Sequence, residues 1–144
     1  MNKKRIAILG STGSIGTQAL DVIAANTHQF EVYAITANNN VDLLIKQAIT
    51  YNPEIVIIAN EKHYLTVKEA LHAYPIKVYA GIKAICETVE LPSVDIVLTA
   101  MVGYAGLLPT IHAVKAGKRI ALANKETLVV AGEIICDLAK QYRS

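Results

Sequence analysis

A glycine-rich turn near the start of the chain combines residue types and a spacing that could bind an anion. Gly10, Gly13 and Gly16 lie between a short β-branched run and a helical pattern. A turn from a strand into a helix leaves backbone N–H groups unpaired, and with the positive helix end these can bind a pyrophosphate. The spacing is GxxGxxG, unlike the GxGxxG of many NAD enzymes. It predicts a dinucleotide or nucleotide phosphate site; the alternative is a tight structural turn.

An asparagine run after the second expected strand is the next candidate. Asn38, Asn39 and Asn40 lie where an NAD enzyme commonly carries an acid that binds the ribose hydroxyls. A neutral amide loop does not repel a 2′-phosphate, so the run favours NADP over NAD. No Lys or Arg lies in the loop to attract that phosphate. The alternative is a polar turn, because Asn readily accepts left-handed backbone angles.

The elements that would position these residues alternate regularly between strand and helix. Apolar runs and turn residues predict strands at residues 5–10, 30–36, 54–59, 77–79, 94–99 and 119–123. Helical spacing predicts helices at residues 14–25, 42–51, 61–73, 82–87 and 105–116 and from residue 125 onward. This order predicts an α/β fold with a doubly wound, mostly parallel sheet of the Rossmann type; the chain is too short for a barrel.

Length and composition fit one such domain. The 144 residues are 53% hydrophobic and 18% charged, which favours a sheet covered on both faces. The net charge of +2 and scattered basic residues argue against a nucleic-acid partner. Cys86 and Cys136 lie far apart, so we expect no disulfide framework and a cytoplasmic location. No apolar run approaches the roughly 20 residues of a membrane helix, so we expect no membrane contact.

Two long segments resemble one enzyme family. The segments are GSTGSIGTQALDVI and AMVGYAGLLPTIHAVKAGKRIALANKETLVVAG. Together with the strands between them, they resemble 1-deoxy-D-xylulose 5-phosphate reductoisomerase, and the resemblance covers essentially the whole chain. It implies that residues 1–144 are the amino-terminal NADPH-binding domain and that the catalytic and carboxy-terminal domains are absent.

The resemblance also implies the reaction of the full enzyme. That family rearranges 1-deoxy-D-xylulose 5-phosphate and reduces the product with NADPH to 2-C-methyl-D-erythritol 4-phosphate, in non-mevalonate isoprenoid precursor biosynthesis. Its Mg²⁺ or Mn²⁺ ligands come from a DSEH-like motif that follows the region matched here. We therefore expect the isolated chain to be inactive, with no catalytic residue or metal ligand of its own, and the full-length protein to be a homodimer.

Site residues follow from the resemblance position by position. The resemblance places four residues near the cofactor phosphates and the adjacent ribose: Thr12, Gly13, Ser14 and Ile15. Near the adenosine end it places Asn40, preceded by Asn38 and Asn39 where the family usually has glycine and a variable, often basic residue. Asn124 and Glu126 would contact the nicotinamide side, and Lys125 the phosphorylated sugar substrate. Asn124 and Glu126 also fit a capped helix start, and the two readings are compatible.

Other features leave alternatives open. Gly103 and Gly106 indicate either backbone close to a ligand or a flexible connection. The four histidines share no spacing that would indicate a metal site; they are His28, His63, His72 and His112. Another NADP-linked dehydrogenase, of the semialdehyde or homoserine type, would share the glycine turn, although LANKETLV and the paired glycines argue against it. A non-catalytic nucleotide-sensing domain would share the fold.

Overall fold

A single parallel sheet organises the chain. The structure is a computed structural model that describes residues 3–101 and 105–122. In these residues six strands take the order β4-β3-β2-β1-β5-β6, and every neighbouring pair is parallel. The strands are β1 (Lys4–Leu9), β2 (Phe30–Ala37), β3 (Ile55–Ile58), β4 (Lys77–Ala80), β5 (Ile96–Thr99) and β6 (Arg119–Leu122).

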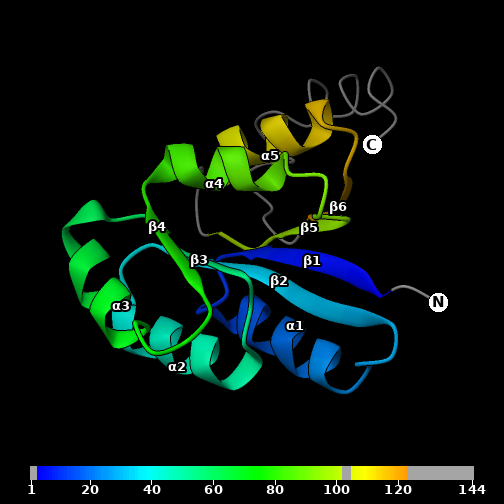
Figure 1. Cartoon of the computed structure of the whole chain (residues 1–144). Helices are drawn as coiled ribbons and strands as arrows, with labels where there is room; N and C mark the ends of the chain where they lie inside the picture. Colours follow the sequence, from blue (N-terminus) through cyan, green and yellow to red (C-terminus); the bar gives the residue numbers. More distant parts are fainter. Residues whose placement is uncertain (1–2, 102–104, 123–144) are drawn as a thin grey trace.

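Helices cover both faces of the sheet (Figure 1). On one face lie α1 (Ser14–Ala24), α2 (Val41–Tyr51) and α3 (Tyr64–Ala70), the last preceded by the 3₁₀ turn η1 (Glu61–His63). On the other face lie α4 (Ile82–Val89) and α5 (Leu107–Lys115). The doubly wound parallel fold predicted from the sequence is confirmed.

Two apolar cores lie between these layers because successive side chains of a strand point to opposite faces. Along β1, Ile6 and Ile8 pack with Leu20 of α1, whereas Ala7 and Leu9 pack with Ile85 of α4. All four residues of β3 are buried, as expected for a central parallel strand. The sheet is therefore a rigid frame for the loops that leave its carboxyl edge.

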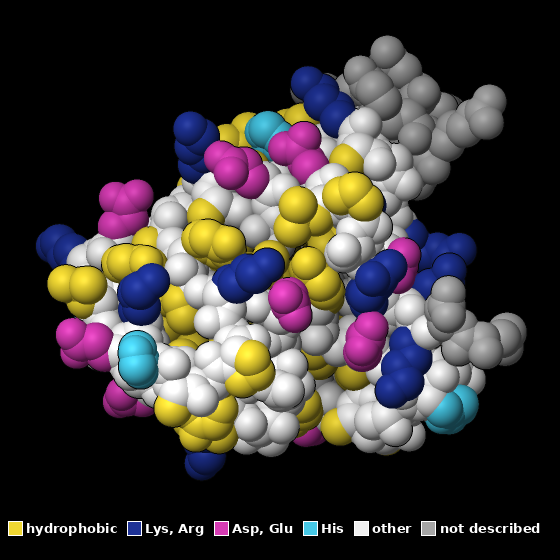
Figure 2. Space-filling model, viewed as in Figure 1, with side chains coloured by type: hydrophobic (Ala, Val, Ile, Leu, Met, Phe, Trp, Pro, Cys, Tyr) yellow, Lys and Arg dark blue, Asp and Glu magenta, His cyan; other side chains and the backbone are white. Residues whose placement is uncertain are grey.

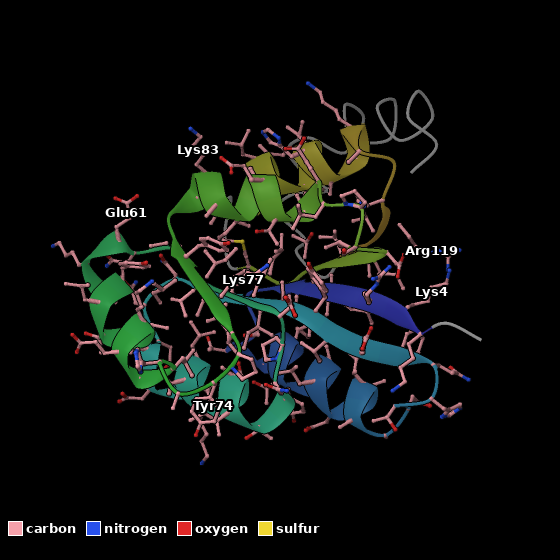
Figure 3. All side chains as sticks on the ribbon, viewed as in Figure 1. Lys4, Glu61, Tyr74, Lys77, Lys83 and Arg119 are labelled. Carbon is pink, nitrogen blue, oxygen red and sulfur yellow. The ribbon has the colours of Figure 1, made fainter. Side chains whose placement is uncertain are left out.

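Strand order reverses between β1 and β5. From β1 the chain runs outward through β2, β3 and β4, and then returns to the other side of β1 to form β5 and β6. In open α/β sheets, ligands bind in the crevice at such a switch point, beyond the carboxyl ends of the strands. Figure 3 helps to locate this edge: Lys4 and Arg119, at the starts of β1 and β6, lie at one end of the sheet, and Glu61, which follows β3, lies at the other.

Most predicted element boundaries differ from the structure by one or two residues, and for two elements the structure shows a local reason. The helix predicted over residues 61–73 begins as a 3₁₀ turn, where the Asn60 side chain accepts a hydrogen bond from the Lys62 N–H, and α3 ends at Ala70. The strand predicted from residue 94 begins at Ile96. Before it, the Asp95 carboxylate accepts a hydrogen bond from the Arg5 N–H at 2.8 Å.

On the face shown in Figure 2, acidic and basic side chains are interspersed. A surface that mixes both signs of charge in this way lacks the continuous basic stripe of nucleic-acid-binding proteins. None of the helices in the described part of the chain has the length and apolar character needed to cross a bilayer.

Candidate nucleotide-binding site

A cavity of about 230 Å³ lies at the switch point of the sheet. Its walls come from three strand ends, those of β1, β2 and β5. The lining residues are Gly10, Thr12, Gly13, Thr36, Ala37, Asn38, Ala100, Met101 and Ala105. Segments far apart in the sequence thus meet where an open parallel sheet binds its ligands.

The three glycines of the turn have different surroundings. Gly10 has a φ of +88°, and a Cβ there would lie 2.8 Å from the Ala100 carbonyl oxygen. A Cβ on Gly16 would overlap the Gly10 carbonyl oxygen and lie 2.6 Å from the Ser11 Cα atom. A Cβ on Gly13 would meet nothing closer than the Gly10 carbonyl oxygen at 3.8 Å. The fold therefore requires glycine at positions 10 and 16, whereas at position 13 the missing side chain leaves open space beside the cavity.

The amino end of α1 is open at the same place. Gly13 is the N-cap residue, and no side chain in the described part of the chain caps the helix. Most helices place Ser, Thr, Asp or Asn at this position because its side chain accepts a free N–H group. At this terminus the first N–H groups and the positive end of the helix dipole remain available to an anion.

Ser11 turns inward and anchors the turn. It is fully buried, and its N–H donates to the Thr36 carbonyl oxygen at 2.8 Å. The Gln47 side chain of α2 makes two further hydrogen bonds with Ser11. The Gly10 N–H donates to the Thr36 hydroxyl at 3.0 Å. Residues 10 and 11 are thus tied to β2 and α2, and Thr12 and Gly13 are the next residues to face the cavity.

The asparagine loop connects β2 to α2. Asn40 is the N-cap of α2, and its side-chain oxygen accepts a hydrogen bond from the Leu43 N–H at 3.3 Å. The Asn39 side-chain oxygen accepts one from the Asn60 side-chain amide at 2.7 Å. Because both oxygens are used in this way, the amide NH₂ groups of Asn39 and Asn40 remain as donors. Only Asn38 of the three lines the cavity.

Among the described residues that line the cavity, none has an ionisable side chain. The pKa shifts lie elsewhere: burial raises the pKa of the Cys86 thiol, burial and the nearby Asp21 raise that of Tyr51, and burial lowers that of Lys118. No group of three His, Cys, Asp or Glu side chains within residues 3–101 and 105–122 could hold a metal ion. In its described part the site offers hydrogen-bond donors and space, which suits binding and not proton transfer.

The structure brings together some of the site residues predicted from the sequence. Thr12, Gly13 and Asn38 line the cavity, and Ser14 and Ile15 form the exposed first turn of α1. Three further predicted residues, Asn124, Lys125 and Glu126, lie outside the described residues, as does Gly103. Gly106 is described: it is the N-cap of α5 and directly follows Ala105, which lines the cavity.

Sequence reasoning missed the residues that anchor the turn. From the sequence alone, a glutamine in a helix such as Gln47 is expected at the surface, yet its side chain is buried and the residue is only 4% exposed. Thr36 was predicted as the end of a strand, yet both its hydroxyl and its carbonyl hold the glycine turn. A polar residue within the apolar face of α2, between Leu44 and Ala48, was the one available signal.

The sheet order, the cavity at the switch point and the open helix terminus define a Rossmann-type α/β domain with a candidate nucleotide site. The chain belongs to the 1-deoxy-D-xylulose 5-phosphate reductoisomerase family, because the model of that family matches residues 6–132. The resemblance seen in the sequence is confirmed.

Named relatives agree with this assignment. The chain is 65% identical over its full length to the 1-deoxy-D-xylulose 5-phosphate reductoisomerase of Bacteroides fragilis and covers 37% of that protein. It is 66% identical over 142 residues to that of Bacteroides thetaiotaomicron, covering 99% of this chain and 36% of the relative. The chain thus spans little more than a third of the length of these curated relatives.

Solved structures show the same relationship. The chain matches the Zymomonas mobilis reductoisomerase in complex with NADPH with a TM-score of 0.92 and 38% identity, covering 98% of this chain and 37% of that one. A homoserine dehydrogenase from Thiobacillus denitrificans matches with a TM-score of 0.61 and 16% identity, covering 99% of this chain and 28% of that one. The latter likeness concerns the fold alone, so the alternative of a homoserine-type dehydrogenase is not favoured.

Proposed function

We propose that residues 1–144 form the NADPH-binding domain of an enzyme that rearranges 1-deoxy-D-xylulose 5-phosphate and reduces the product to 2-C-methyl-D-erythritol 4-phosphate. This reaction belongs to non-mevalonate isoprenoid precursor biosynthesis. The observation that carries the proposal is the open space at Gly13, beside the uncapped amino end of α1 and the cavity at the switch point. The fold does not need a glycine there, whereas a bound pyrophosphate does.

The residues present fit a dinucleotide phosphate. Thr12, Gly13, Ser14 and Ile15 would hold the pyrophosphate, because they surround the open end of α1. The Gly13 N–H donates to the Gly10 carbonyl oxygen at 3.4 Å, so the donors would be the N–H groups of Thr12, Ser14 and Ile15, and Gly13 would leave space for the ligand. Asn38, Asn39 and Asn40 would bind the adenosine ribose and its 2′-phosphate through amide donors. When bound, NADPH supplies the hydride for the reduction, and the protein supplies its orientation.

The rest of the proposed chemistry rests on family membership. Asn124 and Glu126 would contact the nicotinamide side, and Lys125 would contact the sugar phosphate. The Mg²⁺ or Mn²⁺ ion of the full enzyme would be held by residues beyond this sequence and would polarise the sugar oxygens. We further propose a cytoplasmic location and a homodimer for the full-length protein.

Titration of the purified chain with NADPH and NADH tests the binding function. Nicotinamide fluorescence reports binding, and thermal unfolding gives an independent readout, since a ligand of the folded state must raise its stability. We expect NADPH to bind more tightly than NADH and to raise the unfolding temperature. If neither nucleotide binds or stabilises the chain, residues 1–144 alone do not constitute the cofactor site.

A second assay tests whether the 144 residues, which are proposed to bind NADPH, can also catalyse the reaction. We expect the chain with NADPH, the sugar phosphate and Mg²⁺ to show no oxidation of NADPH, because the metal ligands of the family lie in a DSEH-like motif that follows the region matched here. The control is a full-length reductoisomerase under the same conditions. Oxidation of NADPH that depends on sugar phosphate and metal, catalysed by the 144 residues alone, would contradict the proposal.

A further inference from the structure

A buried glutamine interrupts the apolar face of α2. Gln47 is 4% exposed and is flanked on the buried side of the helix by Leu44 and Ala48. Removing a primary amide from water is costly unless it forms hydrogen bonds, and an apolar residue of similar length would fill the same space without that cost. The polar group at this position therefore requires a reason beyond the packing of α2.

Both ends of the Gln47 amide bind the same residue of the glycine turn. Its Nε2 atom donates to the Ser11 carbonyl oxygen at 2.9 Å, and its Oε1 atom accepts from the Ser11 hydroxyl at 2.8 Å. The carbonyl oxygen can only accept, so the two contacts together fix which end of the amide is the donor. Since the Ser11 N–H is bound to Thr36, every polar atom of Ser11 is fixed.

Fixing the Ser11 carbonyl also fixes the direction of a donor that faces the cavity. The Ser11 carbonyl and the Thr12 N–H belong to one planar trans peptide, in which the two groups point in opposite directions. The Ser11 carbonyl accepts a hydrogen bond from Gln47 of α2 at 2.9 Å and a longer one from the Thr17 hydroxyl of α1 at 3.4 Å. Gln47 is the closer donor, and with the carbonyl directed toward it the Thr12 N–H points away from α2. Thr12 lines the cavity, and among the described residues no acceptor binds its N–H group.

We propose that Gln47 is a positioning residue for the cofactor: through Ser11 it holds the Thr12 N–H in the direction that the pyrophosphate requires. The inference rests on the proposed NADPH-binding function. It assigns to a residue of α2 an effect on a ligand that it does not touch. A donor held in place before binding strengthens the interaction because no ordering is needed when the ligand arrives.

Replacing the amide at constant side-chain length tests the proposal. Gln47→Met removes both hydrogen bonds, and we expect the dissociation constants of NADPH and NADH to rise by the same factor, about tenfold. The factors should match because the pyrophosphate is common to both nucleotides. NADPH and NADH differ only in the 2′-phosphate, which is proposed to bind near Asn40 at the amino end of α2. A change in the ratio of the two affinities would therefore place the effect there and overturn the proposal.

Ala48→Gly is the matched control for the stability of α2. Ala48 is fully buried and adjacent to Gln47, and its side chain has no hydrogen bond to lose. The variant should lower the unfolding temperature of the unliganded chain, because glycine weakens a helix interior. Affinity for NADPH, measured well below that temperature, should stay within about twofold of wild type. If Ala48→Gly and Gln47→Met weaken NADPH binding equally, the effect of Gln47 comes from the stability of α2 and the positioning role is refuted.

A double-mutant cycle with Ser11→Ala tests the route of the effect. Ser11→Ala removes the hydroxyl contact and keeps the contact between Gln47 and the Ser11 carbonyl oxygen. If Gln47 acts through that carbonyl, Gln47→Met should weaken NADPH binding in the Ser11→Ala background as well. Loss of the Gln47→Met effect in that background would assign the effect to the hydroxyl contact, against the proposal.

Amide hydrogen exchange in the unliganded chain separates this inference from the proposed function. Gln47→Met should speed exchange of the Ser11 N–H, which donates to Thr36, and leave the interior of β2 unchanged. Unchanged exchange at Ser11 refutes the positioning role whatever the nucleotide titration shows. If exchange speeds up but the wild-type chain binds no nucleotide, the proposed function fails, and with it the cofactor part of the inference.

Discussion

The carbonyl oxygen of Gly10 occupies the space in which a side chain at Gly16 would begin. The first turn of α1 therefore rests directly on the backbone of the glycine turn, so the direction of the helix is set by the turn. Gly13, between them, has no such contact. Of the three evenly spaced glycines, two are required by the fold and the central one leaves room for a ligand.

Gly16→Ala should destabilise the folded chain. Its Cβ would meet backbone atoms of Gly10 and Ser11, which cannot move without disturbing β1 and α1. We expect the free energy of unfolding to fall by about 2–3 kcal/mol, the cost of overpacking a rigid site. Urea denaturation followed by circular dichroism measures this. Wild-type stability in the variant would show that α1 can shift away from the turn.

Gly13→Ala should leave the stability of the chain unchanged but weaken its binding of NADPH. The φ of −76° at Gly13 suits any residue, and the nearest atom to the added Cβ is 3.8 Å away, so stability should stay within about 0.5 kcal/mol of wild type. The methyl group would occupy the space proposed for the pyrophosphate, and the dissociation constant of NADPH should rise at least about tenfold. Fluorescence titration of a variant with normal stability gives the answer; undiminished binding would mean that the phosphate lies elsewhere.

The alternation of strands and helices could be predicted because it depends on the spacing of apolar residues within short segments of the sequence. The four apolar residues of β3, from Ile55 to Ile58, indicate a buried strand without knowledge of its neighbours. The glycine spacing indicated the turn for the same reason. Element ends were less certain, because they depend on side-chain contacts such as the one that Asp95 makes with Arg5.

The unequal roles of the glycines could not be predicted, because the sterics come from distant segments. The atom that excludes a side chain at Gly10 belongs to Ala100, which follows β5. The burial of Gln47 likewise depends on Ser11. Residues of one turn can be recognised from their spacing, whereas the partner that each one meets depends on how the sheet is assembled.

Asn39→Asp should change the preference between the two nucleotides. A carboxylate at this position would repel a 2′-phosphate, so the dissociation constant of NADPH should rise by about tenfold, with a much smaller change for NADH. The difference should shrink at high salt, which screens exposed charges. Gln29→Glu is the control, because it adds the same charge at an exposed position just before β2. An equal effect of both variants would assign the change to net charge alone.

The buried hydroxyls of Thr99 and Thr110 should contribute to stability as a pair. They lie 3.2 Å apart and join the end of β5 to α5, and Thr110 also donates to the Gly106 carbonyl oxygen at 2.6 Å. Thr110→Val keeps the shape but leaves the Thr99 hydroxyl buried without this partner, which should cost about 1–3 kcal/mol. Thr110→Ser retains the hydroxyl, so urea denaturation should find it more stable than Thr110→Val. The reverse order would show that the methyl contact of Thr110 contributes more than its hydrogen bonds.

Titration of Lys118 should make the free energy of unfolding depend on pH at alkaline pH. Its Nζ atom donates to the carbonyl oxygens of Leu91 and Val94, each at 2.6 Å, and burial lowers its pKa below the ordinary 10.5. Between the lowered pKa and 10.5 the unfolded chain binds more protons than the folded chain, so this term raises stability as pH increases through that window. Arg stays charged throughout, so Lys118→Arg removes the term.

The measurement is the difference in unfolding free energy between wild type and Lys118→Arg, from urea denaturation at several values between pH 7 and 10.5. Subtraction cancels groups that titrate in both proteins, including Tyr51, whose raised pKa acts in the opposite direction. We expect wild type to gain stability relative to the variant as the pH approaches 10.5. The carbonyl contacts favour the charged amine and oppose the shift that burial causes. A pH-independent difference would therefore show that these contacts fully offset the burial of the ammonium group.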